Sequence, residues 1–343
     1  MTAAPEVTVI IPTRDRWPLL SATLASALAQ EEVALEVIVV DDGSVDETPA
    51  RLAEVGDERL RVHRHEAGRG VAAARNAAIA AARGEWLAFL DDDDLWAPHK
   101  LRTQLAAAAA RDAAWAYSAA LVVDERWSVV DRFDAPDPDG LLDVLLAYNP
   151  MPAGASNVIA RAAVVRELGG QDESFSHFAG WDLWIKLALV GTAAVCPEPL
   201  LAYVQHPRAM LLSDRESVVT EWERLVEKHR VLAAQRGVEF DRGGLVRWLA
   251  WADSRGGRRL RAAAGYLRAG VMYGFERNFW MSKHSLRDGV GALFGQVLTD
   301  TGRRPLTATA AEPPAWLRAE PPPRPSAHPD RRDLLQRHRS SAA

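Results

Sequence analysis

The chain has 343 residues, of which 48% are hydrophobic, and 41 lysines and arginines against 46 aspartates and glutamates give it a net charge of −5. This length is enough to bury a core, and it predicts one large domain with appendages or two domains. The acidic balance excludes the basic field that nucleic-acid binding requires, so we expect no nucleic-acid partner. The single cysteine, Cys196, excludes an internal disulfide and suits a reducing compartment.

The sequence gives no indication of export or of a membrane span. Residues 1–6 lack the basic and then apolar pattern of a signal peptide. No uncharged apolar run reaches the roughly 18 residues that a spanning helix needs. We therefore expect a cytoplasmic protein and leave open a peripheral contact with the inner face of the membrane.

The first hundred residues alternate between strand and helix patterns. Apolar runs rich in β-branched residues predict buried strands at residues 7–11, 35–40, 60–63 and 86–90. Helical spacing of apolar residues predicts helices at residues 17–30, 46–55 and 71–82. Repeated strand–helix–strand units predict an α/β fold with a mostly parallel, Rossmann-like sheet flanked by helices. Ligands of such sheets bind beyond the carboxyl ends of the strands.

The remainder of the chain is less regular. A further strand is expected at residues 115–123, and helices are expected at residues 141–147, 161–168 and 181–190. The sequence is mainly helical from residue 215 to 297, and from residue 303 it is rich in proline, alanine and arginine, which is typical of a flexible tail. We therefore predict three parts: a domain of residues 1–212, a helical region of residues 213–300 and a tail of residues 301–343.

Four successive aspartates, Asp91 to Asp94, follow the apolar strand at residues 86–90. Like charges this close together repel, and a hard divalent cation that also binds phosphate oxygens would relieve the repulsion. The plain alternative is a solvated acidic turn that caps the helix beginning near Pro98, but a cap needs one aspartate rather than four. We therefore favour a site for a metal and a phosphorylated ligand.

Other polar clusters fall at the ends of predicted strands or beside a glycine-rich turn. Asp41-Asp42-Gly43-Ser44 follows the second strand, and a carboxylate there can accept hydrogen bonds from a nucleotide base or a ribose, although Asp-Gly is also a common turn dipeptide. Thr13-Arg14-Asp15 follows the first strand. Arg75 and Asn76 come after Gly68-Arg69-Gly70, and an arginine there either reaches a base or a diphosphate or simply lies on the surface.

Taken together, these motifs resemble the family 2 glycosyltransferases, which have the GT-A fold. The matching motifs, in order, are Ile11-Pro12-Thr13-Arg14, Val40 to Ser44 with Asp46 and Thr48, Ala74-Arg75-Asn76, Gly84-Glu85, and Asp91 to Trp96. Their order and spacing agree over about residues 6–120. The ordered set is far more specific than any single motif.

The resemblance implies an enzyme that moves a sugar from a nucleotide-sugar donor, a UDP- or dTDP-sugar, to an acceptor hydroxyl with inversion of configuration. The donor site that it implies comprises Pro12, Thr13, Arg14, Asp42, Arg75, Asp91 and Asp92. By the resemblance, Thr13, Asp42 and Arg75 would contact the nucleotide base, and Asp91 and Asp92 would lie near the ribose and the metal.

The resemblance also implies a metal. Asp93 would bind Mg²⁺ or Mn²⁺ directly, and the metal would stabilise the leaving diphosphate. His206 resembles a late histidine that reaches the metal or the diphosphate in some members, although a lone histidine is more often structural.

The catalytic base departs from the family pattern. The family usually places Glu-Asp before Trp-Asp-Leu-Trp, but here Ala179 and Gly180 stand before Trp181 to Trp184. Asp182 is the nearest substitute and our candidate base. Other candidates are Asp172, Glu173 and His177. A structural carboxylate near a helix N-terminus is an equally good interpretation of Asp182.

Three functions remain open. The first is an active transferase in cell-surface polysaccharide or glycoconjugate synthesis, with a glycan, lipid-linked or small-molecule acceptor. The second is a GT-A domain that binds a nucleotide sugar without transferring it, as Ala179 and Gly180 indicate. The third, a metal-dependent phosphatase, explains the acidic run but not the other clusters. A dinucleotide oxidoreductase is disfavoured because no Gly-x-Gly-x-x-Gly follows the first strand.

The helical region after residue 215 carries aromatic residues interleaved with arginines. These aromatics are Trp248, Trp251, Tyr266, Tyr273, Phe275, Phe279 and Trp280. We expect most of them to be buried core, and amphipathic contact with a membrane surface is the sharper alternative. The sequence leaves the oligomeric state undetermined.

Overall fold

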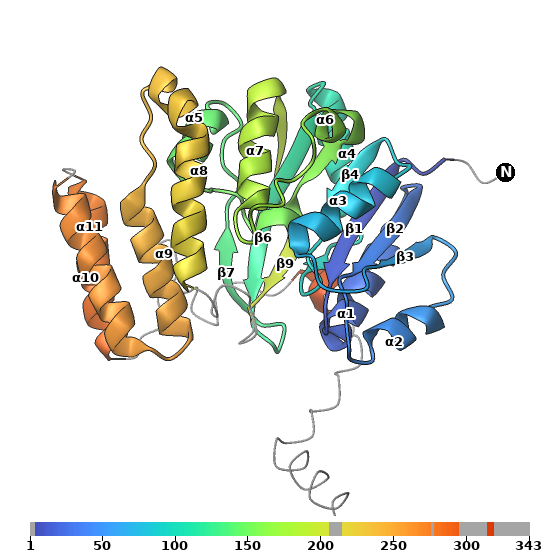
Figure 1. The fold of residues 1–343 in the computed structure, drawn as a ribbon, viewed down its shortest axis with the longest axis horizontal. Helices are drawn as coiled ribbons and strands as arrows, with labels where there is room; N and C mark the ends of the chain where they lie inside the picture. The colour runs from blue at the N-terminus through green and yellow to red at the C-terminus, as the bar shows by residue number, and fades with distance from the viewer. Residues whose placement is uncertain (1–3, 206–214, 276–277, 295–313, 319–343) are drawn as a thin grey trace, which may run out of the picture.

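The computed structural model describes residues 4–205, 215–275, 278–294 and 314–318. Within these residues a nine-stranded sheet has the order β3-β2-β1-β4-β8-β6-β9-β5, and β7 pairs with β6 outside this path (Figure 1). The strands are β1 (Val7–Thr13), β2 (Leu35–Asp41), β3 (Leu60–Arg64), β4 (Trp86–Phe89), β5 (Leu95–Trp96), β6 (Trp115–Val123), β7 (Val129–Phe133), β8 (Ile159–Arg161) and β9 (Ala193–Val204). Strands β1 to β4 are parallel, and β9 is parallel to β6, so the predicted mostly parallel sheet is confirmed.

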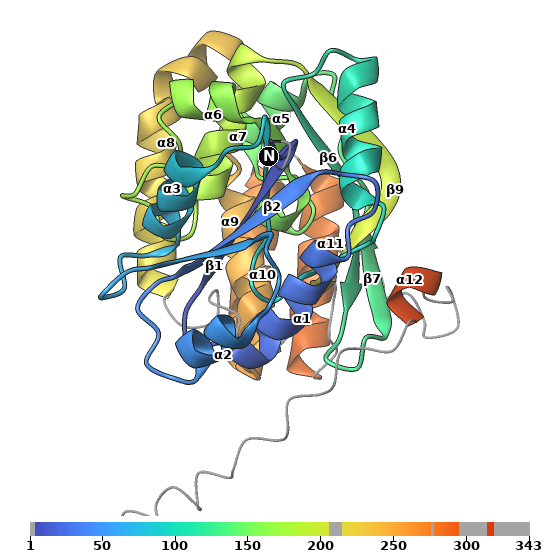
Figure 2. The ribbon, with the colours of Figure 1, turned by 90° about the vertical axis from the view of Figure 1, so that its right-hand side faces the viewer.

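Helices cover both faces of the sheet. The helices are α1 (Trp17–Leu28), α2 (Thr48–Glu54), α3 (Val71–Ala81), α4 (Lys100–Ala110), α5 (Leu141–Ala147), α6 (Ala162–Glu167), α7 (Ala179–Val190), α8 (Arg215–Arg236), α9 (Arg242–Arg255), α10 (Arg259–Phe275), α11 (Phe279–Leu293) and α12 (Ala315–Arg318). A short 3₁₀ turn, Gly154–Asn157, precedes β8. Figure 2 shows α3 and α8 on one side of the sheet and α4 on the other. Of the helices in the described residues, none combines the length and the apolar character needed to cross a membrane.

The alternation of side chains along the strands builds two cores. In β1, Ile10 packs with α3, α5 and α7, whereas Val9 and Ile11 pack on the opposite face with α1 and α4. Ile38 and Val39 divide in the same way in β2. Since successive strand residues point to opposite faces, a strand buried on both faces is mostly apolar, as these two strands are. Their buried polar residues Thr8 and Glu36 are hydrogen-bonded to each other at 2.8 Å.

Two differences from the predicted elements have local causes. Helix α2 begins at Thr48 rather than at Asp46, because Pro49 occupies its first turn and Asp46 stays outside, where its Oδ1 accepts from the Thr48 N–H at 2.9 Å. Strand β9 was not predicted. Pro197 and Pro199 interrupt its pattern, and its register with β6 shifts between Ser118 and Leu121.

Helices α8 and α9 continue the main core, whereas α10 and α11 contribute to separate buried clusters. Val218, Trp222 and Leu225 of α8 belong to the same buried cluster as α7. Trp251, Tyr266 and Tyr273 are buried, as expected for most of the aromatics. The predicted boundaries at residues 212 and 300 and most of the predicted tail lie outside the described residues, so the three-part division stays a prediction.

Lys100 is a fully buried cation at the start of α4. Its Nζ donates to Gln104 Oε1 at 2.6 Å and lies 4.1 Å from the centre of the Trp96 ring. Burial lowers the pKa of Lys100 to about 7. Because an unfolded lysine has a pKa of about 10.4, the unfolded state binds more protons between these two values, and stability should rise with pH across that window.

We expect Lys100→Met to stabilise the protein at neutral pH. Three units of pKa correspond to about 4 kcal/mol, and the Gln104 carbonyl left without its donor offsets about 1–2 kcal/mol, so the net gain is about 2–3 kcal/mol. Urea unfolding of both proteins from about pH 6 to 10 measures the gain and the slope. The variant should lose the rise above pH 7, and equal slopes in both proteins would disprove the assignment.

Candidate donor-binding site

The carboxyl ends of β1, β2 and β4 meet at one edge of the sheet. Thr13 ends β1 and pairs in register with Asp41, and Pro12 precedes it inside the same strand. The Thr13 hydroxyl donates to Asp92 Oδ2 at 2.7 Å. The structure therefore brings together residues that are far apart in the sequence, as expected for strand ends of a parallel sheet. We call Arg16, Arg75 and Asp91 to Asp94 the acidic rim.

Arg16 pairs with two of the four aspartates. Its Nη1 lies 3.0 Å from Asp92 Oδ1 and 3.1 Å from Asp93 Oδ2. Burial disfavours the charged form of Arg16, yet Asp92 and Asp93 raise its pKa above the usual value. Arg14, predicted from the sequence as a donor-binding residue, has a side chain that is 58% exposed and forms an ion pair with Asp15 at 3.8 Å. The feature of the sequence that could have pointed to Arg16 is its position directly before α1.

Arg75 on α3 holds the other end of the run. It forms an ion pair with Asp91, and its Nη1 donates to Gln171 Oε1 at 3.3 Å. Arg75 Nε and Gln171 Nε2 are buried donors that have no partner within the described residues. Because a buried donor without an acceptor is costly, this pair is suited to the acceptor oxygens of a ligand. Gln171 lies in an irregular segment and was not predicted.

Asp42 orders the loop after β3. It accepts hydrogen bonds from the backbone N–H groups of Arg69 and Gly70 and lies 2.7 Å from His65 Nδ1. Burial alone would raise its pKa, but these partners lower the pKa below the usual range, so Asp42 is ionised. Gly43 has φ +80°, and a Cβ there would lie 2.8 Å from the backbone of residue 67, so only glycine admits this close approach.

Asp92 and Asp94 are the buried members of the run. Asp94 accepts from the Ser156 hydroxyl at 2.5 Å and from the Val204 N–H at 3.1 Å, which fastens the rim to the end of β9. Burial, with repulsion from Asp93, raises the pKa of Asp92 to about 7 and the pKa of Asp94 well above the usual value. Helix α4 begins after His99 without a side-chain cap, so the run does not cap it.

Asp91 and Asp93 are the more exposed members of the run, with side chains 35% and 17% exposed. The described residues contain no group of three histidine, cysteine or acidic side chains that forms a metal cage. A Mg²⁺-type ion needs only one or two carboxylates when substrate phosphates complete its shell. The oxygen-only donor set with mutually repelling carboxylates therefore fits a metal bound jointly with a diphosphate. His206, the other predicted metal ligand, lies outside the described residues.

Asp182 is not among the residues that the rim brings together. It is fully buried between α7 and α8, where its Oδ1 lies 2.8 Å from both Lys228 Nζ and His229 Nε2 and its Oδ2 lies 3.2 Å from Lys186 Nζ. Burial would raise its pKa, but these three cationic or polar partners lower it. Such an environment suits an anchor between two helices better than a group that accepts a proton from a substrate.

Residues 170–174 connect the rim to a cavity. Asn76 on α3 accepts from the Gln171 N–H and donates to the Gln171 carbonyl and to Glu173 Oε1, at 2.8 to 2.9 Å. Gly170 has φ +70°, and a Cβ there would lie 2.5 Å from Asn76 Oδ1. Glu173 also lies 3.9 Å from Arg69, while the next residue, Ser174, lines the cavity.

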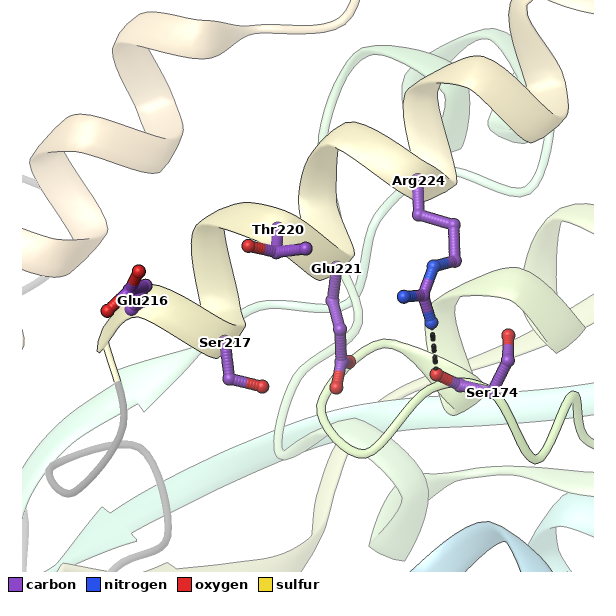
Figure 3. Close-up of a pocket in the computed structure, with 6 residues that line it drawn as sticks. All are labelled: Ser174, Glu216, Ser217, Thr220, Glu221 and Arg224. Carbon is purple, nitrogen blue, oxygen red and sulfur yellow. Dashed lines mark hydrogen bonds between the residues drawn. The ribbon is translucent and has the colours of Figure 1, made fainter.

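The cavity has a volume of about 460 Å³ and a polar lining. Figure 3 shows its lining residues, which are Ser174, Glu216, Ser217, Thr220, Glu221 and Arg224. Arg224 donates to the Ser174 carbonyl at 2.6 Å, and Glu221 accepts from the N–H groups of Ser176 and His177. These bonds hold the segment that starts at the rim against the first turns of α8.

Comparisons with known proteins agree with this arrangement. Residues 8–167 match the model of glycosyl transferase family 2. Succinoglycan biosynthesis protein ExoO of Rhizobium meliloti (strain 1021) is 41% identical over 136 residues, which are 40% of this chain and 35% of that protein. The Escherichia coli protein WfgD, a UDP-Glc:alpha-D-GlcNAc-diphosphoundecaprenol beta-1,3-glucosyltransferase, is 33% identical over 130 residues, which are 38% of this chain and 51% of that protein. The chain thus spans about half of these relatives or less.

A solved structure shares the fold. The crystal structure of S. aureus TarS 1–349 in complex with UDP-GlcNAc matches with a TM-score of 0.55 at 17% identity, over 85% of this chain and 92% of that chain. The sheet and its flanking helices form the GT-A fold, as the resemblance predicted. The similarity to glycosyl transferase family 2 extends over residues 8–167, just under half of the chain.

Proposed function

We propose that this chain transfers a sugar from a nucleoside diphosphate sugar, a UDP- or dTDP-sugar, to an acceptor hydroxyl in the synthesis of a surface polysaccharide. The observation that carries the proposal is the convergence of unpartnered buried donors, Arg75 Nε and Gln171 Nε2, with the carboxylates of Asp91 and Asp93. A nucleotide offers carbonyl and phosphate oxygens to such donors, and its diphosphate can share a metal with the carboxylates.

The residues of the rim and of the neighbouring strand ends have different roles in holding the donor. Thr13 and Arg75 lie at the base end of the site, and Asp91 and Asp92 receive the ribose. Asp42 acts through the loop that it orders, because its carboxylate bonds to the N–H groups of Arg69 and Gly70. Arg14, whose guanidinium lies against Gly68, stands at the mouth of the site.

In the transfer step the acceptor oxygen bonds to the anomeric carbon while the bond from that carbon to the diphosphate oxygen breaks, which inverts the configuration. Asp93, with Asp91, would hold Mg²⁺ or Mn²⁺. When bound together with the diphosphate, the metal supplies charge stabilisation for the leaving group. Arg16 keeps Asp92 and Asp93 in place through its two ion pairs.

Glu173 is the base that the geometry favours. Its carboxylate is about half exposed, bonds to Asn76 of the Ala-Arg-Asn motif, and stands one residue before the cavity lined by Ser174. Of the other candidates, Asp172 is paired with Lys228 Nζ at 2.7 Å, and its pKa is lowered to about 2, against burial, by Lys228 and Ser174. A carboxylate held ionised so strongly is a weak proton acceptor.

The acceptor proposed for the cavity is a glycan. The cavity is lined by hydroxyl, carboxylate and guanidinium groups, which can donate hydrogen bonds to sugar hydroxyls and accept hydrogen bonds from them. The name of the WfgD protein describes a sugar carried on a lipid diphosphate, so a lipid-linked glycan is the acceptor class to test first.

A panel of nucleotide sugars with Mn²⁺ or Mg²⁺ tests the proposal. We expect the purified chain to bind one donor and, with a lipid-linked or short glycan acceptor, to release the nucleoside diphosphate together with a product whose anomeric configuration is inverted. Donor binding without product from any acceptor would favour a binding protein, the function that Ala179 and Gly180 indicate. An absence of binding across the panel would reject both.

A further inference from the structure

Helices α10 and α11 form a hairpin at the edge of the molecule. Helix α10 packs against α9 on one side and against α11 on the other, and the pair lies farthest from β1 to β3 in Figure 1. Arg247 of α9 pairs with Asp288 of α11 at 2.6 Å, which fixes the hairpin to the rest of the chain. The opposite side of the hairpin is therefore its outward side.

Large apolar side chains gather on this hairpin. We call them the apolar stripe: Leu260, Leu267, Val271 and Phe275 on α10, with Leu286, Val290, Leu293 and Phe294 on and just after α11. Phe275 is 86% exposed, and Leu260 and Phe294 are each 78% exposed. With Ala264, the α10 members recur every three or four residues, so they form one helical face. Scattered exposed leucines are ordinary, but a continuous apolar face indicates an interaction site.

The two halves of the stripe meet across the seam between the helices. Leu267 of α10 lies over Gly289 of α11, where an added Cβ would be 3.1 Å from Leu267 Cγ. Leu286 of α11 lies over Gly270 of α10, where the corresponding distance is 2.9 Å. These two glycines let the helices approach closely and place their apolar side chains next to each other.

Cations border the stripe. Arg259, Arg261, Arg268 and Lys283 are exposed, and none of them forms an ion pair within the described part of the chain. The one acidic residue in the described parts of α10, α11 and their connection, Asp288, is fully buried against Arg247. The hairpin surface is therefore positive although the whole chain carries a net charge of −5.

We infer that the outward face of the α10–α11 hairpin docks on an anionic lipid surface. Leucine, valine and phenylalanine side chains would enter the boundary between head groups and acyl chains, and the bordering arginines and lysine would contact lipid phosphates. A second copy of the chain fits this face poorly, because it would bring two positive borders together. The inference is independent of the proposed transfer reaction, since it rests on a surface remote from the acidic rim.

Sedimentation of the full-length chain with lipid vesicles tests the inference. We expect binding to phosphatidylcholine vesicles that contain phosphatidylglycerol to be at least about tenfold tighter than binding to phosphatidylcholine alone, and to weaken with salt. An apolar variant combines Leu260→Ser, Phe275→Ser and Phe294→Ser, and a charge variant combines Arg259→Gln, Arg261→Gln, Arg268→Gln and Lys283→Gln. Each should bind anionic vesicles at least about tenfold more weakly, with an unchanged melting temperature because the replaced side chains are exposed.

The matched control combines Leu189→Ser and Val231→Ser, which are 54% and 60% exposed on other helices and should leave vesicle binding unchanged. Equal binding to both vesicle types, or wild-type binding by the apolar variant, would overturn the inference. The inference would also be overturned if the chain did not bind vesicles but formed a dimer that the apolar variant abolishes. That result would assign the face to a second copy of the chain. Donor turnover with a water-soluble acceptor, measured in parallel, reports on the proposed function separately.

Discussion

Asp93→Ala should lower sugar transfer by about two to three orders of magnitude while the protein stays folded. Asp93 is the partly exposed carboxylate at the centre of the acidic rim, and Arg16 is its ion-pair partner in the structure. Removing it takes away the side chain proposed to hold the metal at the donor diphosphate. Arg16 keeps its contact with Asp92, and one repulsive charge disappears, so the melting temperature should stay the same or rise slightly.

The loss should be visible in two measurements. Product formation at saturating donor gives the fall in turnover, and calorimetric titration with donor and Mn²⁺ should show that the metal no longer strengthens donor binding. Asp57→Ala is the matched control, because Asp57 is also a partly buried aspartate paired with an arginine, Arg59 at 2.7 Å, but lies before β3 at the opposite end of the strands. Wild-type turnover by Asp93→Ala with an intact metal effect would contradict the assigned role.

The sequence was sufficient for strands β1 to β4 and β6 and for the aspartates of the rim, because these follow from local patterns. Runs such as residues 7–11 and 35–40 are mostly apolar, with Thr8 and Glu36 as their polar members, and only a central strand of a covered sheet buries both of its faces. Polar residues directly after such runs must then emerge at one edge, which is how Thr13 and Asp92 come within 2.7 Å of each other. The family 2 match over residues 8–167 covers the part where these patterns are strongest.

The sequence was insufficient wherever a role depends on long-range contact. Gln171 reaches Arg75 because Asn76 on α3 fixes the backbone of its segment, and nothing near Gln171 in the sequence encodes that contact. Arg16 and Arg14 are equivalent by residue type, and only the course of the chain into α1 decides which one faces the aspartates. Strand β9 contains two prolines, which obscure the strand pattern in its sequence. It is a strand because it pairs with β6, a long-range contact that the local sequence does not show.

Asp182→Asn and Glu173→Gln should separate a structural carboxylate from a catalytic one. Asp182 pairs with Lys186, Lys228 and His229 in a buried site. Its replacement leaves the largely buried Lys186 without a counter-charge, whereas Lys228 keeps its pair with Asp172. We expect the free energy of unfolding to fall by about 3 kcal/mol or more, while the folded fraction keeps its transfer rate. Because the pKa of Asp182 is lowered in the folded state, this stabilisation is present above about pH 4 and is lost as the pH falls through the folded pKa.

Glu173→Gln should give the opposite result. Its side chain is about half exposed, so unfolding in urea should change little, whereas transfer should fall by about two to four orders of magnitude with donor binding intact. Normal stability with lost transfer in Asp182→Asn, beside an active Glu173→Gln, would assign the base to Asp182 after all. If both results are obtained, the base would be a carboxylate on the segment between the rim and the cavity, in a chain where Ala179 and Gly180 stand in place of the usual Glu-Asp pair.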